Sequence, residues 1–454
     1  MQMVHYDKDA MKRIAVALLI GIVLFGIAML LFNPVQAALL GIIALMVALW
    51  TNDGLPLAVV SLMPIVLFPA CSILDTKATA ANYAHPIIYL FLGGFMLAIA
   101  VEKTGLHTWI AARMLGIFPN TARGIILSLA MTSGVLSAIL SNTTTTLLLI
   151  SIALFISDDP KLKMRFALAI AYGASVGGIM TPIGTPPNLI LLGIMQEKGM
   201  EAIPFFQWMW MVVPLAAAMF VGVGFILSMG VSGVRVERPV HDEALTLNQK
   251  KVLGLLGGLI VLLLVNAPIK PYWDGLGLSE PGILLGAGLL LFAPPFSLLD
   301  WMKDKEYIPF RIMFLFGAGF SIAKAFSGTG LADAFASYLV NLTTLGPVLM
   351  LICVAALVTF TTEITSNTAL ISIMLPIVYA VAEQSGIDKT LFMMVATICA
   401  SYAFMLPIAT PPNAIAMSSG VVDVKTMAKY GFVFNIMGIA LIVITALLFW
   451  KHVI

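Results

Sequence analysis

The 454-residue chain is poor in charged residues, and this excludes a soluble fold. Asp, Glu, Lys and Arg together make up 10% of the sequence, whereas a soluble globular protein carries about 25%. Hydrophobic residues make up 61%, and the mean hydropathy is +1.05. So few polar residues cannot cover a water-facing surface. The composition therefore predicts an all-α polytopic membrane protein.

The chain also lacks the residues that nucleic-acid, disulfide and metal sites require. Its net charge of +2 excludes nucleic-acid binding as a main role, since many phosphates could not be neutralised. Cys71, Cys353 and Cys399 lie in apolar runs without CxxC spacing, which predicts core residues rather than disulfides or metal ligands. A histidine relay or metal cluster is improbable because the five histidines are scattered: His5, His85, His107, His241 and His452.

Membrane-spanning helices are predicted from apolar runs of about 20 residues. No cleavable signal peptide is evident, because the first run is followed by Asn33-Pro34 without a small-residue cleavage site. The candidate spans are 14–32, 36–50, 55–73, 87–101, 166–195, 207–229, 252–266, 281–297, 312–326, 390–418 and 430–450. The predicted organisation is an N-terminal cytoplasmic segment with the first span (1–35), a first inverted repeat (36–229), a cytoplasmic linker (230–251) and a second inverted repeat (252–454).

Two further apolar stretches, 124–157 and 346–382, predict re-entrant helical hairpins. As one straight helix, the uncharged stretch 124–157 would be roughly 51 Å long, far more than a hydrocarbon core of about 30 Å. Basic residues flank it at both ends, Arg123 and Lys161, so it enters and leaves from the cytoplasmic side. The stretch 346–382 lacks such flanks and is expected to enter from outside. The same rule predicts a cytoplasmic N-terminus and an external C-terminus.

An internal duplication relates the two halves of the chain. The triplet Ser-Asn-Thr at 141–143 recurs at 366–368, an offset of 225 residues. The word Thr-Pro-Pro-Asn at 185–188 recurs at 410–413 with the same offset. Since one hairpin opens inward and the other outward, the copies have opposite orientations. Inverted repeats with broken helices are typical of secondary transporters, whose sites lie at the membrane midplane.

The repeated words predict two kinds of interruption in mid-membrane. Ser, Asn and Thr are strong N-cap residues, so each triplet is expected to form a hairpin tip that starts the second half-helix. The N–H groups at that helix start bind anions, and the carbonyl end of the first half-helix binds cations. The prolines of 185–188 and 410–413 predict that the spans 166–195 and 390–418 unwind, which is tolerated where backbone lines a cavity.

Two charged residues inside apolar runs have no counterpart in the other repeat. Glu363 corresponds to Ala138, so the acid is not part of a duplicated site, and we interpret it as a hydrogen-bond brace for the hairpin. Lys324 corresponds to Ile99, and snorkelling or bracing is our interpretation.

At these motifs the sequence resembles the divalent anion:sodium symporter family. The stretches 362–368 (Thr-Glu-Ile-Thr-Ser-Asn-Thr) and 93–98 (Gly-Gly-Phe-Met-Leu-Ala) strengthen the match, which covers nearly the whole chain. The resemblance implies import of succinate and other C4-dicarboxylates with Na⁺ as coupling ion, no organic cofactor, and no enzymatic activity. It also implies a homodimer in the bacterial inner membrane, surrounded by lipid, that works as an elevator.

The resemblance also implies a set of site residues at matched positions. The substrate-binding residues would be Asn142, Thr143, Ser366, Asn367, Thr368, Thr410 and Pro411. One sodium site would use Ser137, Ser141, Asn142 and Gly184, and the other Thr362, Thr365, Asn367 and Ala409.

The motifs leave other functions open on the same scaffold. A dicarboxylate exchanger, or a sodium-coupled citrate or sulfate carrier, differs in residues outside the repeated words. An anion channel is permitted by opposed hairpins, but saturable sodium-dependent uptake would exclude it. An intramembrane hydrolase is disfavoured because no G-x-S-x-G elbow with a histidine partner occurs.

Overall fold

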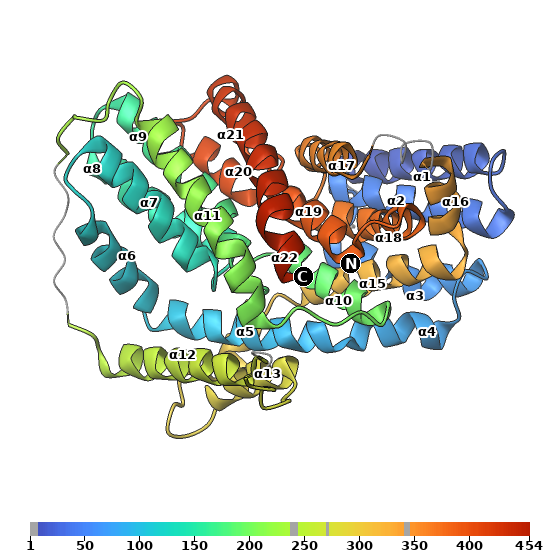
Figure 1. Cartoon of the computed structure of the whole chain (residues 1–454), viewed down its shortest axis with the longest axis horizontal. Helices are drawn as coiled ribbons and strands as arrows, with labels where there is room; N and C mark the ends of the chain where they lie inside the picture. The colour runs from blue at the N-terminus through green and yellow to red at the C-terminus, as the bar shows by residue number, and fades with distance from the viewer. Residues whose placement is uncertain (1–7, 237–243, 269–271, 340–345) are drawn as a thin grey trace, which may run out of the picture.

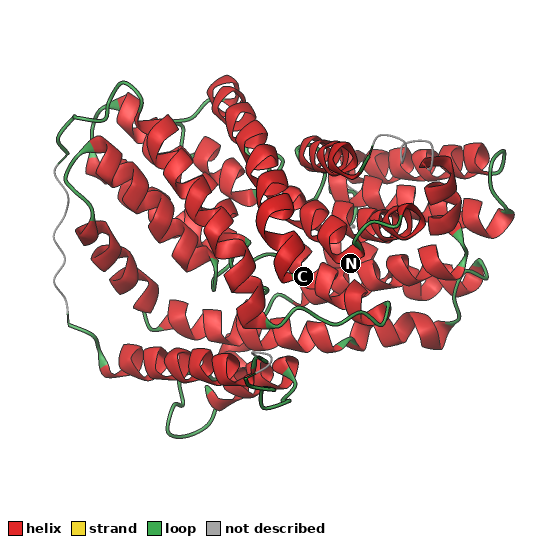
Figure 2. Ribbon diagram, viewed as in Figure 1, coloured by secondary structure: helices red, strands yellow, loops and turns green. Residues whose placement is uncertain are grey.

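The computed structural model describes residues 8–236, 244–268, 272–339 and 346–454. Within these ranges the chain is built from α-helices with short connections, and no β-strand occurs (Figure 2). Eight of the described helices are long and apolar enough to cross a membrane. This confirms the predicted all-α membrane fold, while the number of eleven spans stays a prediction. His5, His241 and part of the predicted linker 230–251 lie outside the described residues.

The first repeat runs from α2 to α11 and follows α1. Its helices begin where the sequence supplies caps: the Asn33 side chain accepts from the Gln36 N–H at α2, and the Thr121 side chain accepts from the Gly124 N–H at α7. The helices are α1 (Lys8–Ala28), α2 (Pro34–Asn52), α3 (Leu57–Ala70), α4 (Thr76–Ala81), η1 (Asn82–Ala84), α5 (Pro86–Lys103), α6 (Leu106–Ile117), α7 (Ala122–Ser137), α8 (Asn142–Ile156), α9 (Pro160–Gly178), α10 (Pro186–Glu197) and α11 (Phe205–Ser228).

The second repeat runs from α12 to the C-terminus and reuses the same order of elements. The helices are α12 (Leu247–Asn266), α13 (Glu280–Leu290), α14 (Trp301–Asp304), η2 (Lys305–Tyr307), α15 (Phe310–Gly328), α16 (Leu331–Leu339), α17 (Pro347–Thr362), α18 (Asn367–Ser385), α19 (Lys389–Ser401), α20 (Pro411–Ser418), α21 (Val424–Thr445), η4 (Ala446–Trp450) and α22 (Lys451–Val453). The predicted span 281–297 is too long, because α13 ends at Leu290 and a turn region follows.

Both predicted hairpins are broken at the predicted triplets. The stretch 124–157 divides into α7 and α8, and 346–382 divides into α17 and α18. The second half-helices begin at Asn142 and Asn367, the middle residues of the Ser-Asn-Thr words. The predicted spans 166–195 and 390–418 are broken as well, since α10 and α20 begin at the first proline of each Thr-Pro-Pro-Asn word.

The two repeats exchange half-helices at the centre of the molecule. The second-repeat helix α20 packs against α8 and α9 of the first repeat, and α10 of the first repeat packs against α18 and α19. Figure 1 shows the result: α7, α8, α9, α11, α20 and α21 form one group, with α1, α2, α3, α15, α16 and α18 on the other side. The exchange brings the four broken segments together.

Small residues allow the hairpin to approach the broken span closely. A Cβ added at Gly177 of α9 would lie 2.1 Å from the carbonyl oxygen of Gly134 in α7, and one added at Gly173 would lie 2.3 Å from that of Ala130. Helices in membranes gain packing contact from such close backbone approach. The pair α7–α9 is therefore closely packed along its length.

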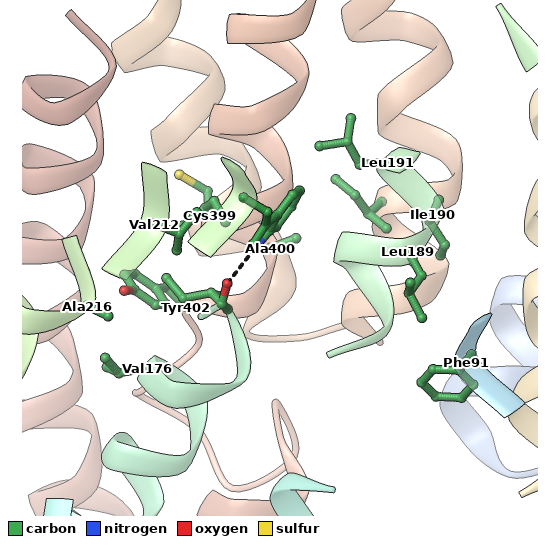
Figure 3. Close-up of a cluster of buried hydrophobic side chains, with 14 of the residues drawn as sticks. Phe91, Val176, Leu189, Ile190, Leu191, Val212, Ala216, Cys399, Ala400 and Tyr402 are labelled. Atoms are coloured by element: carbon green, nitrogen blue, oxygen red, sulfur yellow. Dashed lines mark hydrogen bonds between the residues drawn. The ribbon is translucent and has the colours of Figure 1, made fainter. Parts of the chain in front are cut away.

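The core between the repeats is apolar and closely packed. Figure 3 shows residues of α19 and the segment after it beside residues of α9, α10 and α11, with Phe91 of α5 further away. Cys399 is buried there, as predicted, and Cys71 is partly buried. Cys353 is exposed on α17, so its prediction as a core residue was wrong: in a membrane protein, apolar residues also cover the lipid-facing surface. The labelled core residues are Phe91, Val176, Leu189, Ile190, Leu191, Val212, Ala216, Cys399, Ala400 and Tyr402.

Candidate functional site

Both hairpin tips and both broken segments line a single cavity of about 380 Å³. This volume lies within the roughly 300–1,000 Å³ typical of small-molecule pockets. Helices α5 and α15, together with Leu57 of α3, form the remaining wall. The lining residues from the broken segments are Ile139, Leu140, Ser141, Asn142, Thr143, Ile183, Gly184, Thr185, Pro186, Pro187, Ser366, Asn367, Thr368, Ile408, Ala409, Thr410 and Pro411.

Most of the predicted site residues line this cavity. The whole predicted substrate set lines it, and so do Ser141, Gly184 and Ala409 of the predicted sodium sites. Three predicted sodium residues, Ser137, Thr362 and Thr365, are not among its lining residues. Ser137 and Thr362 are fully buried behind the tips.

The hairpin tips are helix N-caps, as the triplets predicted. Ser141 is the N-cap of α8, and its side chain accepts a hydrogen bond from the Thr144 N–H at 3.1 Å. Ser366 is the N-cap of α18 in the same extended conformation, although its side chain makes no capping bond. Two helix N-termini thus begin at the cavity, each with unsatisfied N–H groups. An anion at this position is stabilised by both helix dipoles.

Matched hydroxyl–amide pairs fix the two asparagines of the tips. The Ser137 hydroxyl donates to Asn142 Oδ1 at 2.5 Å, and the Thr362 hydroxyl lies 2.6 Å from Asn367 Oδ1. Thr362 Oγ1 also lies 2.8 Å from the Ala400 carbonyl oxygen. The equivalent residues thus make equivalent contacts, 225 positions apart. Each pair orients the amide whose other end borders the cavity.

The broken spans are held open by a second pair of asparagines. Asn188 Nδ2 donates to the carbonyl oxygens of Gly178 (3.2 Å) and Thr181 (2.9 Å). Asn413 Nδ2 donates to the equivalent carbonyls, each at 3.0 Å. Both asparagines are fully buried. The last residue of each Thr-Pro-Pro-Asn word therefore satisfies carbonyls that helix breakage leaves unpaired. This role was not predicted from the motif.

A glycine beside the first tip gives the Asn142 side chain its space. A Cβ added at Gly178 would lie 3.0 Å from Asn142 Oδ1. The equivalent residue of the second repeat is Ala403. The two tips are thus similar in hydrogen bonding but differ in how closely the broken span approaches the amide.

Glu363 braces the second broken span from within the protein. Its carboxylate accepts hydrogen bonds from three successive backbone N–H groups, those of Phe404 (2.8 Å), Met405 (2.9 Å) and Leu406 (3.0 Å). Asn435 Nδ2 of α21 donates a fourth, at 2.7 Å. The predicted bracing role is confirmed, although the acid holds the unwound segment after α19 rather than the hairpin alone. Four donors compensate the burial of a charge that is 3% exposed.

In the first repeat, the hairpin is linked to the unwound segment without an acid. The carbonyl oxygen of Ala138, the counterpart of Glu363, accepts a hydrogen bond from the Thr181 hydroxyl at 2.5 Å. One neutral bond there replaces the four bonds of the carboxylate. The acid is therefore specific to the second repeat.

The cavity offers neutral oxygens rather than acidic ligands for a cation. No group of three His, Cys, Asp or Glu residues that could hold a metal ion occurs in the described ranges. A cation at the tips would be held by hydroxyl, amide and backbone carbonyl oxygens, which are hard ligands. Lys324 lies outside the cavity lining, half-buried on α15.

The chain is similar to known transporters over most of its length. A model of the citrate transporter family matches residues 42–391. The sodium-dependent dicarboxylate transporter SdcS of Staphylococcus saprophyticus is 32% identical over 474 residues, covering 94% of this chain and 90% of that protein. The protein of the same name from Staphylococcus aureus is 32% identical over 468 residues, with the same coverage.

Two solved transporter structures share the fold. MtrF of Neisseria gonorrhoeae has a TM-score of 0.58 and 15% identity, covering 81% of this chain and 83% of that one. YdaH of Alcanivorax borkumensis has a TM-score of 0.56 and 15% identity, with coverage of 82% and 89%. At this identity the likeness concerns the fold alone.

Proposed function

We propose, from the premise that the chain belongs to the citrate transporter family, that it imports C4-dicarboxylates such as succinate together with sodium. The family match covers most of the chain, and the curated relatives are named as sodium-dependent dicarboxylate transporters. The chain is thus an integral membrane transporter and not an enzyme. The family resemblance seen in the paired motifs is confirmed by these relatives.

The observation that carries the proposal is the pair of equivalent helix N-termini at one cavity. A C4-dicarboxylate has a carboxylate at each end, and each tip offers an asparagine amide and free helix N–H groups. With Oδ1 of each asparagine engaged by a hydroxyl, Nδ2 is available to donate to a carboxylate. We assign substrate binding to Asn142, Thr143, Ser366, Asn367, Thr368, Thr410 and Pro411.

Sodium ions would sit beside the tips and offset the charge of the dianion. The first site would use Ser137, Ser141, Asn142 and the backbone at Gly184. The second would use Thr362, Thr365, Asn367 and the backbone at Ala409. Support comes from the matched hydroxyl–amide contacts behind each tip. The lining residues include no acid that could balance the charge of the cations. The bound dianion would balance it instead, so the binding of the anion and of the cations would be mutually favourable.

The transport cycle is proposed to follow an elevator in a homodimer of the bacterial inner membrane. The hairpins, the broken spans, α11 and α21 would move as one unit, since α11 packs against α7 and α9, and α21 packs against α17 and α19. The remaining helices would form the static part. The N-terminus would be cytoplasmic and the C-terminus external, as the basic residues predict.

Uptake into proteoliposomes tests the function directly. Labelled succinate should accumulate with an inward sodium gradient, saturate with concentration, and depend cooperatively on sodium. Replacing sodium by potassium should abolish accumulation. Equal uptake driven by a proton gradient alone would reject sodium coupling, and uptake that requires succinate on the opposite side would indicate an exchanger.

Citrate is the second candidate substrate, because the matching family is described by it. Two equivalent tips correspond to two carboxylates, so we favour the dicarboxylate. Competition by unlabelled succinate, citrate and sulfate against labelled succinate ranks the three anions. Stronger competition by citrate than by succinate would reverse this preference.

A further inference from the structure

Arg311 is the one charged residue among those that line the cavity. It lies in the first turn of α15 and belongs to none of the repeated words. Its counterpart in the first repeat is Pro86, so the duplication does not account for it. The neighbouring lining residues of α15, Ile312 and Leu315, are apolar.

The cavity extends from the tips toward the end of the molecule at which Arg311 lies. Leu57, at the start of α3, also lines it, and both helix starts are predicted to be cytoplasmic. The opposite end of α15 contacts the first broken span, since Nζ of Lys198, just after α10, lies 2.6 Å from Ser327 Oγ. Sixteen residues of helix, or about 24 Å, separate positions 311 and 327. The described conformation therefore opens the site toward the predicted cytoplasmic side.

The charge of Arg311 is not neutralised by the described part of the protein. The side chain is exposed and has no hydrogen bond or ion pair with any described residue. Other arginines of the predicted cytoplasmic side are engaged: Arg165 donates to two backbone carbonyls at 2.6 and 2.7 Å, and Arg123 donates to Ser228 at 3.0 Å. Arg311 thus presents a full positive charge at a cavity with an otherwise uncharged wall.

We infer that Arg311 is the residue that binds and steers the dianionic substrate at the cytoplasmic mouth of the cavity. The inference rests on the proposed function and adds a residue outside both hairpin tips. A single charge in a cleft with low-dielectric walls focuses its field and raises the local concentration of opposite charge. A guanidinium also matches a carboxylate in a bidentate geometry. Because the mouth belongs to one conformation, Arg311 acts on one side of the membrane only.

Membrane vesicles of opposite orientation test this sidedness. Inside-out vesicles expose the cytoplasmic face to labelled succinate, and right-side-out vesicles expose the external face. Arg311→Gln should raise the KM for succinate at the cytoplasmic face by about three- to tenfold, while the external KM stays within twofold of wild type. The difference between variant and wild type should shrink as ionic strength rises. Arg311→Lys, which keeps the charge, should retain most of the wild-type KM.

A matched control is available at the same end of the molecule. Lys303 is exposed, pairs with Asp300 at 3.8 Å and does not line the cavity, so Lys303→Gln should leave both KM values unchanged. An unchanged cytoplasmic KM in a functional Arg311→Gln variant would overturn the inference, and so would an equal rise at both faces. If wild-type protein shows no sodium-driven succinate uptake in right-side-out vesicles, the proposed function itself fails.

Discussion

Lys198 and Ser327 join the two repeats at the end of the molecule opposite Arg311. The Lys198 ammonium, just after α10, donates to the Ser327 hydroxyl near the end of α15 at 2.6 Å. The same ammonium lies 4.7 Å from the ring centroid of Tyr379 on α18. This contact connects a broken span to a helix of the cavity wall. We expect it to stabilise the conformation in which the predicted external end is closed.

Removing this contact should favour the conformation that is open to the outside. With Lys198→Met, the conformation whose cavity opens to the cytoplasm should be populated less often. The loss of one hydrogen bond of roughly 1 kcal/mol shifts the ratio of two conformations several-fold. The measurement is the labelling rate of Leu315→Cys by an impermeant thiol reagent applied from the cytoplasmic side, in a protein in which Cys71, Cys353 and Cys399 are replaced. We expect this rate to fall about two- to fivefold relative to the protein with Lys198 intact.

Lys389 provides the control for the loss of a lysine near Tyr379. Its ammonium lies 4.9 Å from the same ring, but its ion pair is with Glu383 at 2.8 Å, and both belong to the hairpin and broken span of the second repeat. Lys389→Met should leave the labelling rate unchanged. Equal effects of both substitutions would show that the ring contact, not the bond to α15, controls the conformation.

Loss of the Glu363 charge should impair transport while the protein still inserts and folds. Glu363→Gln keeps the size of the side chain, but its amide cannot accept at both ends. At least one of the four donors then loses a charged acceptor, which costs roughly 1.5–3 kcal/mol. We expect succinate uptake to fall about tenfold or more, with a weaker sodium dependence. The readout is uptake at several sodium concentrations, at matched protein content.

Glu383→Gln is the matched control for this substitution. Glu383 is half-exposed and pairs with Lys389 at 2.8 Å. Such exposed pairs contribute little to stability. Transport should be unchanged. Near-normal uptake by Glu363→Gln would mean that the unwound segment keeps its shape without the carboxylate.

The positions of the four breaks could be predicted from the sequence because each break has a local cause. Ser141 and Ser366 cap the helices that follow them, and Pro186 and Pro411 occupy first helical turns. Caps and prolines act within a few residues, so the printed sequence already contains them. The duplication then indicated that the four breaks belong to one site.

The cavity wall and the supporting contacts could not be predicted in the same way. Arg311 belongs to no repeated word, and nothing local indicates which helix starts border a cavity formed by both repeats. The role of Asn188 and Asn413 depends on which carbonyls the breaks leave free. The donors to Glu363 come from 41 to 72 residues away. Such contacts depend on tertiary packing, which motif spacing does not encode.

Asn142→Ala and Asn367→Ala should each abolish or severely impair transport. Each substitution removes a donor to a carboxylate, which costs roughly 1.5–3 kcal/mol, or about 10- to 150-fold in affinity. Asn142→Ala also leaves the Ser137 hydroxyl without its acceptor, whereas Thr362 keeps the Ala400 carbonyl oxygen when Asn367 is replaced. Sodium dependence should weaken together with succinate affinity. Pro182 lies in the unwound segment before α10, and Pro182→Ala should be milder because it alters backbone shape without deleting a ligand. Near-normal kinetics in either asparagine variant would make the tips structural caps only.

The ion pair between Lys103 and Asp304 should stabilise the protein at neutral pH and not in strong acid. Lys103 Nζ and Asp304 Oδ2 lie 2.6 Å apart where α5 ends beside α14, and Asp304 lies outside the helices that are long enough to span a membrane. Burial alone would raise the pKa of Asp304, but the Asp300 N–H and the Lys103 ammonium lower it on balance. A lowered folded pKa means that the contribution is present above the ordinary value of about 3.9 and is lost as pH falls through the folded pKa.

Thermal unfolding in detergent measures this dependence. Lys103→Met should destabilise the protein by about 1–3 kcal/mol at pH 7, because the buried carboxylate keeps fewer donors. The difference from wild type should stay constant between pH 5 and 8 and shrink below about pH 4. A difference that disappears between pH 6 and 8 would contradict the assignment to Asp304.

Gly178→Ala should weaken the first sodium site more than the second. The added methyl group would lie 3.0 Å from Asn142 Oδ1, so the amide or the broken span must shift by a few tenths of an ångström. Because the second repeat already carries Ala403 at this position, Ala403→Gly is the matched change and should leave sodium dependence nearly intact. We expect Gly178→Ala to raise the sodium concentration for half-maximal uptake several-fold and to reduce its cooperativity. If Ala403→Gly has the larger effect, the close approach at Gly178 does not position Asn142 for sodium.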